Sequence, residues 1–334
     1  MKTGTSSETD ASGAALAIFA LGHADASLSF IRLLPDETRA DVETILAFRL
    51  LSRLWNQYCI DNGASPGRTL LGADNGYEIR VFSALIDEVC NWPPLRVANG
   101  VVRSHSPALS LYERELYETE LDDKRPQLLD IGEQIERLPL DITPWKRAAL
   151  LIDRCHKLDE MSDHGICWGL NLSGAFSLLP LGSPKAAIPF PALFSREMLR
   201  FDRSPSWRES ALQAGIAESA HAVSAMAFGG FNDHIAFDRE FQSLRKHSRL
   251  RRAFHYLAGS GELSPALLGR LLGCSAPGAR KMLNQLVLAG LATHHPPSPI
   301  FSHLGRFRLG WSSALWLRSF SVEAAAPFMD LFDD

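Results

Sequence analysis

Apolar residues recur at intervals of three and four positions over most of the chain, and this spacing predicts a protein built mainly from α-helices. The clearest case is Asp36–Ile60, where Val42, Ile45 and Leu50 share one face behind a first turn of acidic residues. Asn62–Gly63 ends this helix. Further helices are predicted over Tyr77–Val89, Ser106–Glu120, Pro144–Leu158, Ala192–Phe201, Ser206–Phe228 and Asp233–Lys246. The apolar run Trp168–Leu179 fits either a buried helix or a strand by composition, and the neighbouring helices favour a helix.

Some stretches depart from this pattern. Residues 1–11 are small and polar, which predicts a disordered tail. After the break at Pro93–Pro94, Leu95–Val102 is predicted to be a brief strand or extended chain. Tyr112–Asp141 is rich in carboxylates and interrupted by prolines, so we expect this segment to be the flexible or solvated portion of the body. Gly229–Gly230 is expected to end the helix before it.

The most informative pattern lies near the carboxyl end, where two short helices flank a tight turn. Ser264–Pro265 supplies an N-cap and a proline at the first helical position, and Gly273 stops the helix after Leu272. Ser275 then caps a second helix over Ala276–Ala289. A helix, a turn of three to four residues and a second helix form the layout of a helix-turn-helix.

A strand, a loop and a returning strand are predicted after these helices. They cover Leu291–His295, Pro296–Pro299 and Ile300–Leu309. With Leu250–Leu257 as a first helix, the whole predicts a winged helix-turn-helix. The alternative is a helical hairpin with an appended ribbon that only packs against the rest of the protein.

The second helix has a polar face suited to DNA. Met282, Leu283, Leu286 and Val287 mark its buried side, and small residues at its start leave room for a close approach to a groove. We expect Ser275–Gln285 to enter the major groove. The predicted DNA-binding residues are Ser275, Arg280, Lys281, Asn284 and Gln285 on this helix, with Arg249, Arg251, Arg252, Arg306 and Arg308 on the phosphate backbone.

Charge favours the same interpretation. From Arg239 to Arg308 there are 11 basic and 2 acidic residues, a net charge of +9, whereas the whole chain carries −4, so the remainder sums to −13. A basic module attached to an acidic body is typical of proteins that bind nucleic acid. The alternative is a solvated helix face, because Arg245, Lys246, Arg249 and Arg252 would share one exposed surface in any case.

The amino-acid composition is that of an ordinary soluble protein and does not alter the predicted fold. The 334 residues are 46 % hydrophobic, enough for a sizeable core. The sequence indicates no apolar run long enough to span a bilayer, and the apolar segment Ala14–Gly22 is short and has no basic flank. The five cysteines have no pair spacing, which argues against a disulfide framework. We therefore expect a cytoplasmic protein with no membrane partner.

Candidate chemistry is sparse. Cys155, His156, Asp159, His164 and Cys167 form the densest group of potential metal ligands, but they lack the two-residue knuckle of a structural zinc site. No glycine-rich phosphate loop, paired CxxC or GxSxG elbow is present. The sequence therefore predicts no catalytic residue, no metal and no cofactor.

The wing has its own candidates. His294–His295 and His303 could gather there and contact phosphates when protonated, and the alternative, which we prefer, is an ordinary exposed loop.

The order of elements resembles that of Fic-like proteins with a C-terminal helix-turn-helix, in particular a plasmid-borne group from rhizobia. The residues that carry the likeness are Ser248–Leu250, Leu271–Ala279 and Leu286–Leu291. Fic enzymes transfer a nucleotide to a hydroxyl with a histidine base and an Asn-containing anion loop. The corresponding segment, Leu179–Arg196, has neither histidine nor asparagine. The resemblance therefore implies a regulator that has lost the catalytic motif.

These patterns together predict a transcriptional or plasmid-maintenance regulator that binds double-stranded DNA, by default as a homodimer. The alternatives are a non-catalytic adaptor that holds proteins through the winged-helix fold and the C-terminal tail, and a Fic-like nucleotidyl transferase with an altered site. The regulator could also bind a protein partner through its N-terminal body or its C-terminal tail. The predicted divisions are a tail (1–11), an N-terminal helical region (12–140), a central helical domain (141–247), the winged module (248–310) and a C-terminal helix with an acidic tail (311–334).

Overall fold

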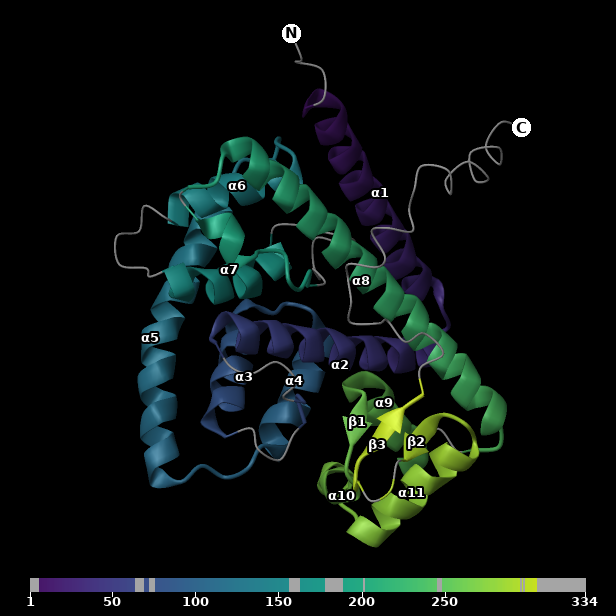
Figure 1. The fold of residues 1–334 in the computed structure, drawn as a ribbon. Coiled ribbons are helices and arrows are strands. Elements are labelled where there is room, and N and C mark those ends of the chain that lie inside the picture. Colours follow the sequence, from purple (N-terminus) through teal and green to yellow (C-terminus); the bar gives the residue numbers. More distant parts are fainter. Residues whose placement is uncertain are drawn as a thin grey trace, which may run out of the picture. The chain divides into compact units, whose positions relative to one another are not determined.

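The protein is mainly helical in the computed structural model, as the spacing predicted (Figure 1). The described residues are 6–63, 69–71, 76–155, 163–177, 189–200, 202–244, 248–294, 296 and 298–304. The predicted C-terminal tail, 311–334, lies outside them. Their helices are α1 (Ser6–Leu33), α2 (Asp36–Asp61), α3 (Tyr77–Val89), α4 (Pro93–His105), α5 (Leu111–Glu136), α6 (Pro144–Cys155), α7 (Asp163–Ser177), the 3-10 helix η1 (Arg196–Leu199), α8 (Pro205–Glu240), α9 (Arg249–Ser260), α10 (Pro265–Leu272) and α11 (Ala276–Leu288).

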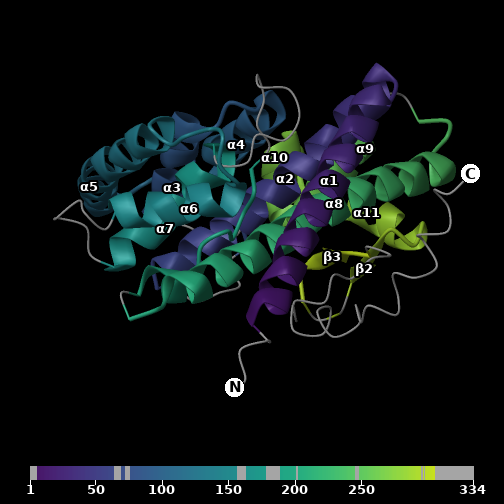
Figure 2. The ribbon, with the colours of Figure 1, turned by 90° about the horizontal axis from the view of Figure 1, so that it is seen from above.

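Helix α2 packs against α1, α3, α4, α7, α8 and α9, and α1 and α8 lie side by side as a long pair (Figures 1 and 2). Small residues bring this pair together, because Ala17, Ala20 and Ala24 of α1 are buried against the alanine-rich α8. A buried hydrogen bond of 2.6 Å joins the hydroxyls of Ser27 and Ser224 across the pair. The α1–α8 pair is thus specified by small side chains and one polar link.

Helix α1 differs from the sequence expectation. It begins at Ser6, inside the stretch predicted to be disordered, and it extends the apolar segment Ala14–Gly22 to Leu33. By length and composition, Ser12–Leu33 is the one helix in the described part of the chain that could cross a membrane, with 33 % of its most apolar window buried. The prediction that no such run exists was wrong, because polar residues such as Ser27 are too few to interrupt the run.

Helix α8 is continuous where two helices were predicted. Gly229 and Gly230, taken from the sequence as a helix end, lie inside it and face α2. A Cβ atom at Gly229 would lie 2.8 Å from Nη1 of Arg49, and one at Gly230 would lie 3.7 Å from the carbonyl oxygen of Val42. Gly229 therefore leaves room for the Arg49 side chain, whereas a Cβ atom at Gly230 would meet only ordinary van der Waals contacts, and neither glycine ends the helix.

Two further segments are more regular than expected, for local reasons. Leu95–Val102 is helical, because the prolines before it occupy the first turn of α4, where a missing N–H costs nothing. Most of Tyr112–Asp141 is also helical. Ser110 and Glu113 form a capping box at the start of α5, with 2.8 Å between the Ser110 N–H and the Glu113 carboxylate, and the helix continues through Pro126.

The predicted helix Ala192–Phe201 is replaced by extended chain and η1. Ala192 has a positive φ of 64°, which no α-helix accommodates. Asn171 of α7 holds the chain beyond it, since its amide accepts from the Phe194 N–H at 2.8 Å and donates to the Phe194 carbonyl at 2.9 Å. A buried side chain far away in sequence therefore overrides the local helical preference.

The described C-terminal residues 248–304 consist of α9, α10, α11 and a three-stranded antiparallel sheet. The strands are β1 (Glu262–Leu263), β2 (Ala292–His294) and β3 (Phe301–His303), in the order β1-β3-β2. Leu263 pairs with Phe301, and Thr293 pairs with Ser302. The two later strands fall within the predicted ones, and the part of Ile300–Leu309 beyond residue 304 lies outside the described residues.

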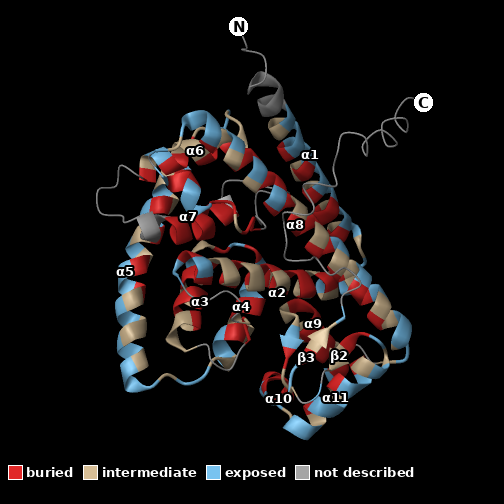
Figure 3. Cartoon of the chain, viewed as in Figure 1, coloured by how far each residue is buried: buried red, intermediate tan, exposed pale blue. Residues whose placement is uncertain are grey.

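One apolar core connects these helices to the rest. Met1–Leu304 forms a compact unit, and buried side chains from α2, α8, α9 and α11 belong to the same cluster (Figure 3). Phe237 of α8 and Phe254 of α9 illustrate the continuity, since their rings stack with centroids 4.8 Å apart. Residues 248–304 therefore pack on the helical body through a shared hydrophobic core.

Candidate nucleic-acid interface

Two glycines shape the turn between α10 and α11. Gly273 has a φ of 59°, a left-handed conformation that glycine adopts at little cost. Gly269 has no room for a side chain, because a Cβ atom there would lie 2.8 Å from the carbonyl oxygen of Cys274. The Cys274 N–H also donates to the Gly269 carbonyl at 2.9 Å. These contacts fix how α11 leaves α10.

Helix α11 begins at an exposed N-cap. The Ser275 hydroxyl accepts a hydrogen bond from the Gly278 N–H at 3.3 Å, as the sequence predicted for a cap. Ala276 and Pro277 in the first turn are exposed, and Gly278 is half-buried. The start of α11 thus presents small residues to solvent, together with the positive end of its helix dipole.

The two faces of α11 are those that the sequence predicted. Ala279, Leu283 and Leu286 are fully buried, and Met282 and Val287 pack against the core. The predicted base and phosphate contacts are all exposed. They are Arg280, Lys281, Asn284 and Gln285. Since residues four positions apart in a helix are neighbours, these four side chains form one contiguous surface, and we call it the α11 face.

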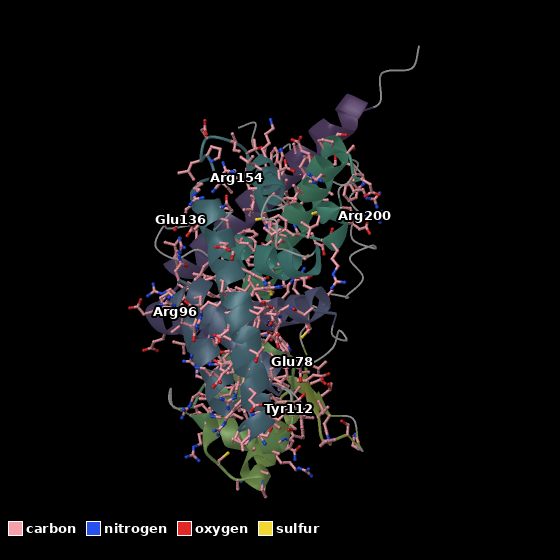
Figure 4. The ribbon with its side chains drawn as sticks, turned by 90° about the vertical axis from the view of Figure 1, so that its left-hand side faces the viewer. Glu78, Arg96, Tyr112, Glu136, Arg154 and Arg200 are labelled. Atoms are coloured by element: carbon pink, nitrogen blue, oxygen red, sulfur yellow. The ribbon has the colours of Figure 1, made fainter. Side chains whose placement is uncertain are left out.

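The α11 face lies in a basic part of the molecule. Residues 248–304 contain 6 basic residues and 1 acidic residue, Glu262, a net charge of +5. Among the described residues, no ion pair engages Arg280 or Lys281. Helix α5, which runs between Tyr112 and Glu136 in Figure 4, has 9 acidic and 3 basic residues, a net charge of −6. The net charges of these two regions therefore have opposite signs.

The three arginines predicted on α9 divide into two groups. Arg249 and Arg252 are exposed. Arg251 is not available to phosphate, because it bridges Asp41 of α2 at 2.6 Å and Asp238 of α8 at 2.9 Å, with 16 % of its side chain exposed. Its assignment as a DNA contact was wrong. The sequence shows Arg249, Arg251 and Arg252 close together, but it does not show that Arg251 pairs with carboxylates of α2 and α8.

Two predicted contacts, Arg306 and Arg308, lie outside the described residues. One exposed cation was missed in the choice of contact residues, because Arg270 projects from α10 close to the turn. The sequence did carry this signal. Leu267, Leu268, Leu271 and Leu272 mark the buried side of α10 and place Arg270 on the opposite side.

The histidines of the predicted wing contact protein groups. His294 stacks on Phe301 with centroids 4.2 Å apart, and its Nε2 lies 2.7 Å from the Ser298 carbonyl oxygen. His303 points inward, with 8 % of its side chain exposed, and its Nε2 lies 3.5 Å from a carboxylate oxygen of Asp233. Both interpretations offered for His303, a phosphate contact and an exposed loop, were wrong. His295 lies outside the described residues.

The residues 248–304 are held on the body by close packing and polar links. Gly259 of α9 lies against Phe48 of α2, where any Cβ atom would overlap the Phe48 side chain. Arg49 of α2 joins three elements, since it pairs with Asp233 of α8 and donates to the Ala258 carbonyl of α9 at 3.1 Å and to the Met226 carbonyl at 3.3 Å. This attachment leaves the α11 face exposed.

The cysteines of the candidate metal cluster are buried. Burial raises the pKa of Cys155 to about 12, and burial together with the nearby Asp61 raises the pKa of Cys167 further above its usual range. Within the described part of the chain, no three His, Cys, Asp or Glu side chains are placed to hold a metal ion. The side chains of His156, Asp159 and His164 lie outside that part.

A pocket of about 570 Å³ opens between α2 and α4. Its walls are mainly apolar, with Phe48 and Trp92 as the largest side chains and Arg32 and Glu43 as the charged ones. Phe48 also meets Tyr256 of α9 edge to face at 5.4 Å. One wall of the pocket is therefore in direct contact with the helix that precedes α10.

In comparisons with known proteins, no family model, curated protein or solved structure matches this chain. The similarity to Fic-like proteins remains a prediction from the residues named above.

Proposed function

We propose that this protein is a DNA-binding regulator of transcription or plasmid maintenance, and that residues 248–310 form a winged helix-turn-helix. The order of elements in residues 248–304 supports the proposal: helix, strand, two helices joined by a tight turn, and two further strands. In this arrangement α11 is the recognition helix. The loop between β2 and β3 forms the wing.

The observation that carries the proposal is the α11 face. Arg280, Lys281, Asn284 and Gln285 are all exposed around a buried apolar side, as on any amphipathic surface helix, and the kind of side chain on this face is what favours DNA. Arginine, asparagine and glutamine have the forked groups that read base edges in the major groove, and lysine binds phosphate as a point charge. Small residues at the start of α11 allow it to approach the groove.

Each residue takes a role from its position. Arg280, Asn284 and Gln285 read bases, and Lys281 binds phosphate. Arg249, Arg252 and Arg270 add backbone contacts outside α11. The acidic α5 opposes binding at its own surface, since like charges repel a phosphate backbone, and this favours approach from the basic side.

The helical body serves dimerisation and the binding of a partner or ligand in this proposal. Paired half-sites multiply the sequence information that one recognition helix reads, so a homodimer is the expected form. The pocket beside Phe48 suits a small, mainly apolar ligand, because its volume falls within the usual range of roughly 300 to 1,000 Å³ for ligand sites. The contact of Phe48 with Tyr256 gives such a ligand a route to α9.

The proposal is tested by the binding of the full chain to a labelled DNA duplex, with sequences selected from a random library. We expect the double variant Arg280→Glu, Lys281→Glu to bind at least about tenfold more weakly, since four units of charge change at the groove. Arg114→Glu, Lys146→Glu is the matched control, because both residues are exposed on other helices and the change in net charge is the same. Equal effects of the two double variants, or none, would refute the α11 face as the DNA contact.

Two smaller changes separate base reading from phosphate binding. Asn284→Ala should change the selected sequence more than the salt dependence. Arg249→Gln and Arg252→Gln should each lower the slope of log affinity against log salt by about 0.9, with the selected sequence unchanged. A protein without any DNA affinity at low salt would instead favour the adaptor, and transfer of label from a nucleotide to protein would favour the Fic-like enzyme.

A further inference from the structure

Helix α1 carries two stripes of residues at alternating spacings of three and four, and α8 covers only one of them. The covered stripe contains Ala17, Ala20, Ala24 and Ile31, all buried. The other stripe is apolar except for His23 and largely uncovered in the described chain, since His23 and Phe30 meet α8 only along one edge, and we call it the open seam. The open seam consists of Leu16, Phe19, His23, Ala26, Phe30 and Leu33.

The open seam is exposed along its whole length. Leu16 is 41 % exposed, Phe19 66 %, Phe30 37 % and Leu33 85 %, and His23 and Ala26 are also exposed. Large apolar side chains in one continuous row on a surface mark an interaction site.

Helix α8 extends the apolar surface on one side. Phe228 lies 6.0 Å from His23 and 6.2 Å from Phe30 between ring centroids, and Phe228 is itself 40 % exposed. The result is a two-helix face, formed by the open seam of α1 and the exposed Phe228 of α8.

The spacing identifies the kind of partner. Positions separated alternately by three and four residues average 3.5 residues, which is the repeat of helices packed as a coiled coil. The partner is therefore an α-helix that lies nearly parallel or antiparallel to α1, and not a flat surface or a small molecule.

We propose that the open seam binds the open seam of a second copy of this chain, with the two α1 helices antiparallel about a two-fold axis between Ala24 and Asp25. In that register Leu16 faces Leu33 of the second copy, Phe19 faces Phe30, and His23 faces Ala26. Each layer then joins side chains of matching size, or one large side chain and one small. The stripe is complementary to itself when reversed, as an isologous interface requires.

The parallel register fits less well. It would place Ala26 against Ala26, which leaves a gap, and His23 against His23, which brings two imidazoles together. Charge does not oppose the antiparallel contact, since the open seam has no Asp, Glu, Lys or Arg. Small residues beside it, Ala15 and Gly22, allow the second backbone to approach.

The available area suits a dimer. A helix of 22 residues is about 33 Å long, and two neighbouring helices are about 20 Å wide, so each copy offers on the order of 650 Å². A standard interface takes about 800 Å² from each partner. A bilayer is the less suitable occupant, because the Ser224 hydroxyl binds the Ser27 hydroxyl and Nδ1 of His23 and so ties α1 to α8.

This inference rests on the proposed function only in that the regulator is expected to be a dimer. Dimerisation is measured without DNA, so the two proposals can fail separately. A chain that stays monomeric but binds DNA through Arg280 would end this inference alone. A dimer that ignores DNA would end the proposed function alone.

The first test is the mass of the full chain in solution, from light scattering and sedimentation equilibrium. We expect a dimer for the parent chain and a roughly 100-fold weaker dimer for Phe19→Glu, since the interface would bury two unpaired carboxylates. Phe19 is exposed, so the variant should keep its helical content. Leu140→Glu, at a position 82 % exposed and away from α1, is the control and should remain dimeric.

The second test fixes the register by disulfide formation in a Cys274→Ser background, because the other four cysteines are buried. Leu16→Cys together with Leu33→Cys should cross-link two chains under mild oxidation, whereas Leu33→Cys alone should not. Cross-linking by Leu33→Cys alone would refute the antiparallel register. A monomeric parent chain, or association with phosphatidylcholine and phosphatidylglycerol vesicles that Phe19→Glu abolishes, would refute the second copy as the partner.

Discussion

Arg251 of α9 donates a hydrogen bond of 2.6 Å from Nη1 to the Oδ2 atom of Asp41 on α2. Asp41 also lies 3.4 Å from Nδ1 of His234 and 3.5 Å from Nε2 of His255. Burial raises the pKa of Asp41, but the hydrogen bond from His234, the nearby His255 and the ion pair with Arg251 together outweigh burial and lower the pKa below its ordinary value. The arginine is thus part of the link between α9 and the body.

Loss of this pair should destabilise the protein without changing how it binds phosphate. We expect Arg251→Ala to lower the free energy of unfolding by about 2 kcal/mol, less than the roughly 3 to 5 kcal/mol of a fully buried pair, because both side chains keep some exposure. A double-mutant cycle with Asp41→Ala, measured by urea unfolding, should give a coupling of about 1 to 2 kcal/mol. The salt dependence of DNA binding by Arg251→Ala should match that of the parent.

The control cycle uses Arg137 and Glu133, an ion pair of 2.9 Å on α5 in which both side chains are 63 % exposed. Its coupling should be about 0.5 kcal/mol or less, since solvent screens the pair. Two results would contradict this prediction. The coupling energy between Arg251 and Asp41 could be no larger than that of the control pair, or Arg251→Ala could lower the slope of log affinity against log salt. Either result would mean that Arg251 contacts DNA.

The turn between α10 and α11 gives a second prediction. In Gly269→Ala the new methyl group would lie 2.8 Å from the Cys274 carbonyl oxygen, a backbone atom that moves only if the turn moves. We expect a loss of about 1 to 3 kcal/mol in unfolding free energy and weaker DNA binding, because α11 is displaced. Gly132→Ala in α5 is the matched control, since its Cβ atom meets nothing within 4 Å. That change should stabilise the protein by about 0.5 to 1 kcal/mol, and equal effects of the two substitutions would contradict the prediction.

The sequence predicted those helices whose position depends only on nearby residues, namely on the spacing of apolar side chains and on the residues at the helix ends. Asp36–Ile60 and Tyr77–Val89 combine an amphipathic pattern with clear ends, and the structure has helices over Asp36–Asp61 and Tyr77–Val89. The predictions were wrong where the same type of residue can occupy different structural positions, depending on its neighbours. Gly229 reads as a helix end from sequence, yet it lies inside α8, where it accommodates Arg49. Only the neighbouring helix reveals which position applies.

In the candidate site, too, local features could be predicted from the sequence and contacts between distant residues could not. The exposed and buried sides of α11 follow from helical spacing within a few residues, so the sequence was enough to predict the exposure of Arg280 and Lys281. Arg251 and His303 could not be predicted in this way. Their partners, Asp41 and Asp233, are far away in sequence, and only the packing of α9 and β3 against α2 and α8 brings them together.

The buried histidines give a third prediction, concerning pH. Burial lowers the pKa of His255 to about 4 against the opposing effect of Asp41, and burial lowers the pKa of His303 to about 4 against that of Asp233. In the unfolded chain both titrate near about 6.5. As the pH falls below 6.5, the unfolded state therefore takes up protons that the folded state does not. Stability is thus lost from about pH 6.5 down to about pH 4.

Each histidine can contribute up to about 3 kcal/mol to this loss, since one pKa unit corresponds to about 1.4 kcal/mol. The measurement is urea unfolding at several pH values between 7.5 and 4.5 for the parent chain and for His303→Gln. Glutamine keeps a polar side chain near Asp233 but cannot take up a proton, so the variant should be less stable at pH 7.5 and lose less stability on acidification. Other titrating groups are shared by the two chains, and their contributions cancel in the difference. If the unfolding free energies of the two chains changed equally with pH, His303 would titrate normally in the folded protein. The inward position of its side chain beside Asp233 would then be wrong.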